Sequence, residues 1–316
     1  MWRRRRVVQT LRDPSEPFDP RVDAVELRLD FCPEADVGRF AATCGKPVVA
    51  TVRRARDGGR WDAGEEGRRA LFRRAAAAAF VDVELDAAED LAPEGPRRVV
   101  SVHDTAGVPE DLDGLFQRCL LRGADVVKIA ATPCSAAEAF RLLDLPTPGL
   151  GMGSFGAFTR VLAPWTYCAR EPVAPGMPTP EDLLDLYDVR RLGPAPALYG
   201  VAGDPIEHSE SPHLWNPFLA REGMDAVYVR FRVSRLATFW PAFLAHGGRA
   251  LSVTAPLKEE AAALARDPSD EVRACGAANL LVRDGRAFNT DALALLDLLP
   301  PGRGPAPVMW AGCAAR

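Results

Sequence analysis

The sequence predicts an α/β protein with a (β/α)8 TIM barrel first and a smaller α/β domain second. In the first half, short β-branched segments alternate with helical stretches, which is the pattern of parallel βαβ units. A proline-rich joint, Leu192-Gly193-Pro194-Ala195-Pro196, separates this pattern from a second one. The 316 residues, 47% of them hydrophobic, suffice for about two domains with cores of their own.

Eight predicted strands account for a barrel over residues 1–192. A weak strand opens it at 7–11, and the stretches 64–79 and 110–122 are predicted to be helices, the second with apolar residues at the 3.6-residue helical period. The length is compact for a barrel of this type. The other predicted strands cover residues 22–30, 47–53, 80–86, 97–103, 124–130, 149–152 and the neighbourhood of Tyr167.

The second half predicts a smaller α/β domain over residues 197–300. Two helices, 211–222 and 235–246, separate three strands, and a hairpin over 279–289 turns at Asp284-Gly285. The remaining elements are strands at 197–202, 226–233 and 250–254, and a last helix at 291–299.

Composition and charge exclude several classes of protein. The net charge of −4 gives no electrostatic reason to expect nucleic acid as a partner, and no apolar run approaches the roughly 18 residues of a membrane span. The basic cluster Arg3-Arg4-Arg5-Arg6 precedes only a short apolar stretch, so it is not a secretory signal. Seven scattered cysteines without a C-x-x-C pair indicate neither a disulfide framework nor a metal site. We therefore expect a cytoplasmic protein.

Only three of the 39 basic residues are lysines: Lys46, Lys128 and Lys258. Arginine replaces lysine wherever a positive charge suffices, whereas only an amine can lose its proton and form an imine. Lys128 lies in an apolar predicted strand, where loss of hydration favours the neutral, nucleophilic amine. A Schiff-base lysine and a structural ion pair with Glu84 or Asp86 are the two interpretations. We assign no role to Lys46.

Further polar residues stand near the carboxyl ends of the predicted strands. These ends meet at one rim of a parallel barrel, and the chemistry of such barrels collects there. His103 is either a satisfied core histidine or a catalytic base, and the residue alone does not decide between them. The others are Glu26, Arg28, Arg53, Glu84, Asp86 and Asp104.

The segments around these residues resemble type I 3-dehydroquinate dehydratase over residues 1–192. The order and spacing of six blocks make the resemblance specific. The blocks are Val25-Glu26-Leu27-Arg28-Leu29-Asp30, Thr51-Val52-Arg53 with Asp57-Gly58-Gly59, Ser101-Val102-His103-Asp104, Val127-Lys128-Ile129-Ala130, Gly151-Met152-Gly153 with Arg160, and Ala174-Pro175-Gly176.

The resemblance implies a lyase of the shikimate pathway that dehydrates 3-dehydroquinate to 3-dehydroshikimate without a cofactor. It implies that Lys128 forms an imine with the C3 ketone, and that His103 removes the C2 proton and assists loss of the C1 hydroxyl. Asp57 stands where the family usually has Glu, next to that histidine. The positions that bind the substrate's hydroxyls and carboxylate match Glu26, Arg28, Arg53 and Arg160.

The loop that closes over the site departs from the family. Family members have Ser, then Ala-Pro-Gly, then Gln, whereas this chain has Val173-Ala174-Pro175-Gly176-Met177. Two polar contacts to substrate are thus replaced by apolar side chains, from which we expect weaker substrate binding and closure. A non-catalytic binder of quinate-like or shikimate-like acids is the alternative that this loop favours.

From Ala197 onward the chain resembles the substrate-binding domain of shikimate dehydrogenase. The two families occur fused in this order in bifunctional enzymes, so each resemblance supports the other. The matching segments are Gly203-Asp204-Pro205, His208-Ser209-Glu210-Ser211-Pro212, Ser252-Val253-Thr254-Ala255-Pro256-Leu257-Lys258, Gly276-Ala277-Ala278-Asn279 and Asn289-Thr290-Asp291.

This second resemblance implies a site for shikimate or 3-dehydroshikimate. Ser209 and Ser211 match the hydroxyls that bind the carboxylate, while Lys258 and Asp291 match the pair that handles the proton of the reacting hydroxyl. By themselves, the two serines would equally form a helix cap, and the lysine would be a surface residue. The positions that line the ring match Thr254 and Asn279.

A shikimate dehydrogenase also implies NADP and a Rossmann domain with a glycine-rich turn. Residues 301–316 resemble a linker and the stub of such a domain, with a degenerate turn at Gly312 in which Trp310 and Cys313 replace two glycines. We therefore expect no NADP-dependent reduction by this chain alone. A dehydrogenase with an incomplete cofactor domain is the alternative function.

Overall fold

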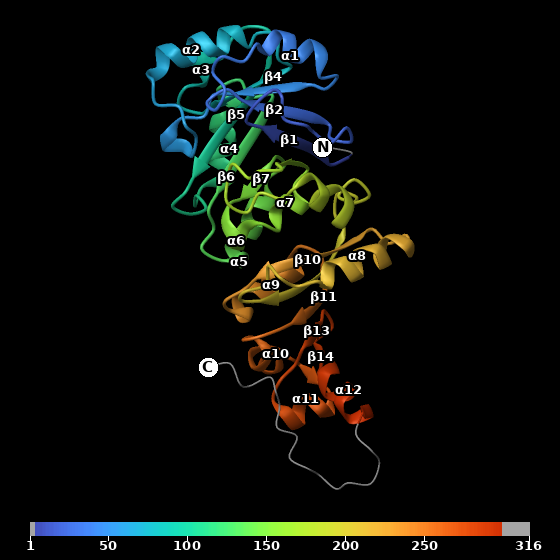
Figure 1. Cartoon of the computed structure of the whole chain (residues 1–316). Helices are drawn as coiled ribbons and strands as arrows, with labels where there is room; N and C mark the ends of the chain where they lie inside the picture. Colours follow the sequence, from blue (N-terminus) through green and yellow to red (C-terminus); the bar gives the residue numbers. More distant parts are fainter. Residues whose placement is uncertain (1–3, 299–316) are drawn as a thin grey trace. The chain divides into compact units, whose positions relative to one another are not determined.

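The computed structural model describes residues 4–298 (Figure 1). These residues form two compact units. Unit 1 comprises residues 4–196 and His213–Asp225, and unit 2 comprises Ala197–Pro212 and residues 226–298. The predicted linker and Rossmann stub, residues 301–316, lie outside the described residues.

Unit 1 contains an eight-stranded, all-parallel sheet that is nearly closed into a barrel, which confirms the predicted fold class. The strand order is β7-β6-β5-β4-β3-β2-β1-β8, so β1 lies between β2 and β8. Within the described residues no ladder joins β7 to β8; β7 spans only three residues. The strands are β1 (Arg6–Leu11), β2 (Ala24–Arg28), β3 (Val48–Thr51), β4 (Phe80–Glu84), β5 (Arg97–Asp104), β6 (Val126–Ala131), β7 (Gly149–Gly151) and β8 (Trp165–Cys168).

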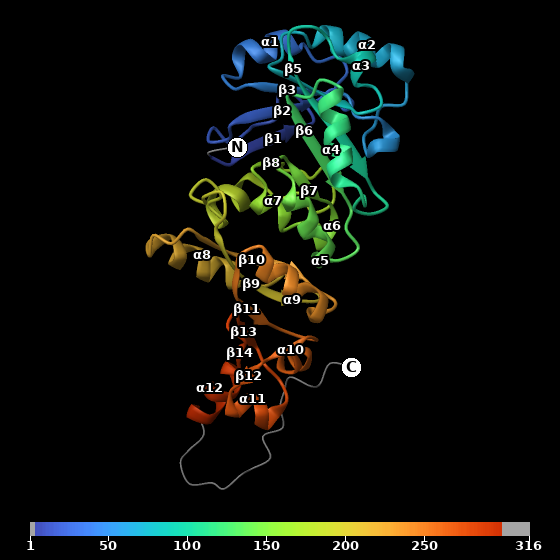
Figure 2. The same ribbon diagram turned by 180° about the vertical axis from the view of Figure 1, so that it is seen from behind.

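Helices cover the outside of these strands, as α1 to α4 show in Figures 1 and 2. The helix predicted over 64–79 ends at Arg74, because the alanines that follow turn back toward β4, with Ala78 N bonded to Ala75 O at 2.9 Å. The α-helices are α1 (Val37–Thr43), α2 (Gly64–Arg74), α3 (Ala88–Leu91), α4 (Leu112–Leu121), α5 (Ala136–Ala139), α6 (Gly153–Gly156) and α7 (Thr159–Leu162). Two 3₁₀ helices, η1 (Ala55–Asp57) and η2 (Phe140–Asp144), and one π-helix, η3 (Asp182–Leu186), are also present among the described residues.

Two layers of side chains fill the barrel, because every second residue of a strand points to the same side. Each strand gives one residue to an apolar layer: Val8, Ala24, Val49, Phe80, Val99, Val126, Leu150 and Trp165. Two positions further along each strand lies a second buried layer: Thr10, Glu26, Thr51, Asp82, Ser101, Lys128, Met152 and Tyr167. The apolar layer holds the barrel together, and the second layer places charged groups on top of it.

Unit 2 is built on a six-stranded sheet of order β10-β9-β11-β13-β14-β12. Its first three strands are parallel, and β13 and β14 form the predicted antiparallel hairpin. The strands are β9 (Ala197–Gly203), β10 (Ala226–Arg232), β11 (Gly248–Val253), β12 (Asp267–Pro268), β13 (Leu280–Val282) and β14 (Arg286–Phe288). Its helices are α9 (Leu236–Ala245), α10 (Lys258–Leu264), α11 (Asp270–Cys275) and α12 (Thr290–Leu298). Helix α8 (Ser211–Arg221) belongs to unit 1 from His213 onward.

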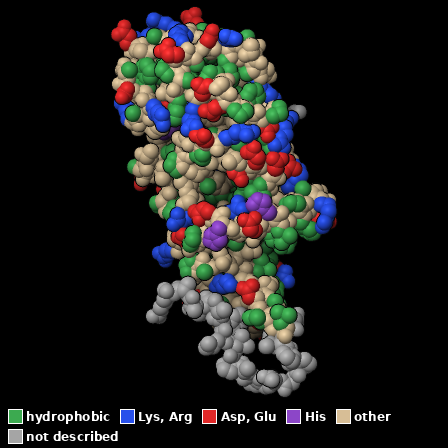
Figure 3. Space-filling view, viewed as in Figure 1, with side chains coloured by type: hydrophobic (Ala, Val, Ile, Leu, Met, Phe, Trp, Pro, Cys, Tyr) green, Lys and Arg blue, Asp and Glu red, His purple; other side chains and the backbone are tan. Residues whose placement is uncertain are grey.

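The surface mixes charges of both signs. On the face drawn in Figure 3, acidic and basic side chains are interspersed, as the small net charge suggests. No helix in residues 4–298 combines the length and the apolar character needed to cross a membrane.

Candidate active site

Lys128 lies in the second layer, on β6, and its amine is paired with a buried carboxylate. Nζ donates to Oδ2 of Asp82 at 2.9 Å and lies 3.8 Å from Oε1 of Glu26. It also sits 3.9 Å from the centre of the Tyr167 ring. Only 8% of the side chain is exposed. The amine is therefore held in a fixed place, largely out of water.

In the ion-pair interpretation of Lys128, the partners named from the sequence were Glu84 or Asp86, whereas the structure pairs the amine with Asp82. Glu84 lies one layer further along β4, and Asp86 is 56% exposed and pairs with Arg54. Asp82 precedes Glu84 by two residues, so both point into the barrel. The same alternation could have identified Asp82 as the partner of Lys128 from the sequence.

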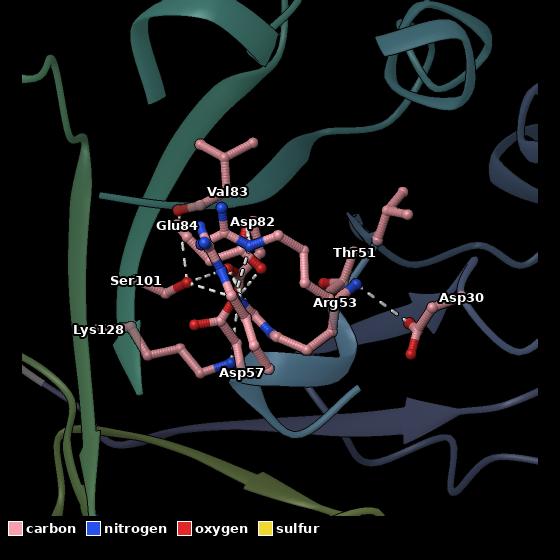
Figure 4. Close-up of polar contacts among 12 residues, drawn as sticks. Asp30, Thr51, Arg53, Asp57, Asp82, Val83, Glu84, Ser101 and Lys128 are labelled. Atoms are coloured by element: carbon pink, nitrogen blue, oxygen red, sulfur yellow. Dashed lines mark hydrogen bonds and ion pairs between the residues drawn. The ribbon is translucent and has the colours of Figure 1, made fainter. Parts of the chain in front are cut away.

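Asp82 is the centre of a buried hydrogen-bond cluster (Figure 4). Besides Lys128, it accepts from Nη2 of Arg53 at 2.7 Å and from Oγ of Ser101 at 2.6 Å. Burial favours the neutral acid, but Arg53 and Lys128 outweigh it and hold the pKa of Asp82 well below the usual range. Asp82 is therefore ionised at neutral pH and fixes two cations beneath the cavity described next.

A cavity of about 120 Å³ opens at the carboxyl ends of the strands. One part of its wall is charged or polar, and the other part is apolar. The first part includes Glu26, Arg28, Arg53, Asp57, His103, Lys128 and Arg160, and the second includes Ala130, Leu150, Met152, Val173, Ala174, Pro175 and Met177. The structure thus brings together all seven barrel residues that the sequence singled out for the catalytic and substrate-binding positions.

His103 stands near the end of β5, on the wall of this cavity. Burial, and then the charges of Arg53 and Lys128, lower the pKa of His103 well below its ordinary value, against the opposing effect of Asp82. The imidazole is consequently neutral at neutral pH, which is the form that can accept a proton.

Glu26 and Arg28 are held rigidly by neighbours in the barrel. Glu26 accepts hydrogen bonds from Thr10 at 2.6 Å and from Thr51 at 2.8 Å. Arg28 forms a two-pronged pair with Asp30, at 2.8 and 2.7 Å. Both side chains reach the cavity in fixed orientations, as polar groups that orient a ligand must.

Arg160, on α7, is a buried cation whose charge is uncompensated. Its Nε donates to the carbonyl of Gly151 at 3.1 Å, and within the described chain no carboxylate forms an ion pair with it. Burial alone lowers its pKa to about 10. A ligand anion in the cavity would relieve this cost and bind the guanidinium with two hydrogen bonds.

The loop 173–177 contributes four residues to the apolar part of the wall. Gly153 N donates to Pro175 O at 3.0 Å, which ties the loop to the end of β7. Gly176 has φ +73°, and a Cβ there would lie 2.7 Å from the Gly153 carbonyl, so only glycine fits. Met177 packs against the hydrophobic core cluster, which also includes Met152 and Tyr167. The loop therefore rests on the cavity with apolar side chains.

The structure does not pair Asp57 with His103. The Asp57 carboxylate accepts from Nε of Arg54 at 2.6 Å instead. Arg54, which lies just outside the matched block Thr51-Val52-Arg53, was not predicted to take part in the site.

In unit 2, the residues singled out form two local pairs. Lys258 Nζ donates to Asp291 at 2.7 Å, and the Ser209 hydroxyl donates to that of Ser211 at 3.2 Å. Thr254 follows β11, with its N–H bonded to Ala202 of the neighbouring β9 at 2.9 Å. Tyr228, which was not singled out from the sequence, donates to Ser252 at 2.8 Å. Asn279 donates to Thr290 at 2.9 Å.

The family model for type I 3-dehydroquinase matches residues 15–194, more than half of the chain. The chain belongs to this family. A second model, for the shikimate dehydrogenase substrate binding domain, matches residues 201–281. The predicted fusion of the two families is confirmed.

Relatives of both kinds are found. A chloroplastic bifunctional 3-dehydroquinate dehydratase/shikimate dehydrogenase of Arabidopsis thaliana is 32% identical over 92% of this chain and 54% of its own length. The 3-dehydroquinate dehydratase of Methanothrix thermoacetophila is 35% identical over 51% of this chain and 79% of its own length. A shikimate dehydrogenase (NADP(+)) of Caulobacter vibrioides is 43% identical over 37% of this chain and 46% of its own length. The chain spans about half the length of the bifunctional plant protein.

Proposed function

We propose that this chain dehydrates 3-dehydroquinate to 3-dehydroshikimate through an imine on Lys128. The observation that carries the proposal is the position of the Lys128 amine, fixed by Asp82 in a cavity that also holds a neutral His103 and an uncompensated Arg160. The family and the dehydratases among its relatives support the same reaction.

The chemistry balances with these residues alone. The Lys128 ammonium, paired with Asp82, first passes a proton to the neutral His103. The free amine adds to the C3 ketone, His103 returns the proton to the departing oxygen, and loss of water gives an imine that withdraws electrons from C2. His103 takes the C2 proton, and the electron pair moves into the imine. The C1 hydroxyl then leaves as water, with His103 returning the proton as the C1–C2 double bond forms. Hydrolysis of the imine releases 3-dehydroshikimate and restores Lys128.

The direct test is a dehydratase assay on the purified chain. With 3-dehydroquinate as substrate, we expect the absorbance of the conjugated enone product to appear. No enone, together with measurable binding of the substrate, would instead identify a non-catalytic binder.

Replacing Arg160 by alanine is expected to raise KM for 3-dehydroquinate about 10- to 100-fold, since hydrogen bonds to a charged group contribute about 1.5–3 kcal/mol each. Arg160→Lys keeps the positive charge but lacks the planar guanidinium that can donate two hydrogen bonds to one carboxylate. Its KM should therefore lie between those of the wild type and Arg160→Ala. Steady-state kinetics measures both. A KM within twofold of wild type in Arg160→Ala would show that Arg160 does not bind the substrate's carboxylate.

The pH dependence of kcat/KM reports the pKa of the catalytic base, His103. Because the pKa of His103 is lowered from 6.5, the imidazole stays neutral as the pH falls through that value. The acidic limb of the profile should therefore lie below pH 6.5, and activity should be lost only at lower pH. Measurement of kcat/KM from about pH 5 to pH 8 tests this. A limb near pH 7 would contradict it.

We also propose that unit 2 binds shikimate or a similar ring acid. The pair Lys258–Asp291 joins a proton donor to an acceptor at 2.7 Å, as handling of a hydroxyl proton requires. NADP is the cofactor that the shikimate dehydrogenase family implies. The turn expected for it, at Gly312, lies outside the described residues, so we derive no hydride-transfer step.

A further inference from the structure

The Asp57 carboxylate borders the same cavity as His103, yet it is bound elsewhere. Nε of Arg54 donates to Oδ2 of Asp57 at 2.6 Å. The two nitrogens at the tip of Arg54 donate to both oxygens of Asp86, at 3.1 and 2.7 Å. Only 10% of the Arg54 side chain and 17% of the Asp57 side chain are exposed. Arg54 thus donates hydrogen bonds to two carboxylates, and those of Glu65 and Glu84 lie within ion-pair distance, at 3.7 and 3.9 Å.

Local backbone structure fixes this pairing. The single turn η1 places Asp57 three residues after Arg54, and Asp57 N donates to Arg54 O at 3.0 Å. Gly58 ends the turn with φ +81°, a left-handed conformation that favours glycine. Side chains three residues apart in such a turn lie on the same face, which brings the carboxylate onto the guanidinium.

His103 lacks the carboxylate that Asp57 would supply. Its Nδ1 is shielded from solvent and has no hydrogen-bond partner in the described part of the chain. The charged groups that act on the ring are Arg28 of β2, Arg53 of β3, Asp82 of β4 and Lys128 of β6. Three of these four are cations. A hydrogen-bond acceptor at Nδ1 would fix the tautomer of the ring and stabilise its protonated form. Without such an acceptor, His103 has neither effect.

We propose that Arg54 is a positioning residue that withholds the Asp57 carboxylate from His103. The role of His103 as base rests on the proposed function, but the arrangement itself does not depend on turnover. By holding Asp57, Arg54 leaves His103 a neutral, unassisted imidazole among cations. Removal of Arg54 releases Asp57 to accept a hydrogen bond from Nδ1–H.

The test is the titration of His103 in the full chain, followed by NMR without substrate. The chain has four histidines, and His103→Gln assigns the signal. In Arg54→Gln, the pKa of His103 should rise by about one unit, because a nearby carboxylate favours the charged ring. Arg56→Gln is the matched control: Arg56 pairs with the same Asp86 but is 64% exposed and lies 3.8 Å from Asp57. It should leave the titration unchanged.

Two more variants separate the released carboxylate from the mere loss of a cation. In the double variant Arg54→Gln/Asp57→Asn, the pKa of His103 should return to the wild-type value, since the Asp57 carboxylate is gone and the other acids next to Arg54 are the same as in the single variant Arg54→Gln. Asp57→Asn alone should leave the titration of His103 unchanged. Because asparagine has the same shape as aspartate, this variant still tests the proposal if Arg54→Gln does not fold.

The proposal is overturned if Arg54→Gln leaves the pKa of His103 unchanged, or if the double variant keeps the shift. It is equally overturned if Asp57→Asn lowers that pKa, because Asp57 would then already serve His103 in the wild type. A chain that shows these shifts but no dehydration would refute the proposed function and leave the role of Arg54 standing.

Discussion

Replacing Lys128 by alanine is expected to lower kcat/KM for 3-dehydroquinate by about 10³-fold or more, the scale on which single catalytic groups act. Without the amine no imine forms, and the C2 proton has no electron sink beside it. The enone absorbance of the product measures the loss directly.

Lys128→Arg is the control that separates chemistry from charge. Arginine keeps a cation next to Asp82, so the buried cluster retains its charge balance. A guanidinium cannot form an imine, so this variant should be as inactive as the alanine variant while melting closer to wild type. Activity above a tenth of wild type in Lys128→Arg would contradict the imine.

Replacing Asp82 by alanine should reduce the free energy of unfolding by about 3–5 kcal/mol, because it leaves buried cations without their acid. Arg53 and Lys128 both donate to Asp82, and neither side chain is more than 8% exposed. Urea unfolding measures the change. Because the pKa of Asp82 is lowered in the fold, its contribution in wild type is present above the ordinary Asp pKa and is lost only as the pH falls below it.

The matched control is Asp86→Ala. Asp86 also pairs with arginines, but its side chain is 56% exposed, and such pairs contribute about 0–1 kcal/mol. A loss in Asp82→Ala no larger than that in Asp86→Ala would show that the buried cluster does not stabilise the barrel.

Most of the strands could be predicted from the sequence because they are short β-branched runs between turns; β7, Gly149–Gly151, has no β-branched residue. All eight barrel strands and the 279–289 hairpin appear close to their predicted places. The short helices α3, α5, α6 and α7 have four residues each, too few for an apolar period to show. The end of α2 was also missed, since its alanines favour a helix by propensity alone.

The sequence predicted which side chains line the cavity, because this depends on their positions in the strands. It did not predict which side chains form hydrogen bonds with one another. Lys128 and His103 reach the cavity because they stand on neighbouring strands at the rim. Alternate residues of β4 point into the barrel, so Asp82 points inward like Glu84, one layer deeper. Predicting the pair Lys128–Asp82 requires this alternation to be traced back from Glu84 to Asp82. The pairing of Asp57 with Arg54 depends on a single turn and on two competing partners, which no spacing rule decides.

The imine itself can be trapped. The chain is incubated with 3-dehydroquinate, reduced with borohydride, and mapped by peptide mass spectrometry, with Lys46 and Lys258 as the internal controls, since they are the other two lysines. We predict one substrate adduct, on the peptide that contains Lys128, and none in Lys128→Ala. An unmodified Lys128, or an adduct that persists in Lys128→Ala, would contradict a Schiff-base dehydratase.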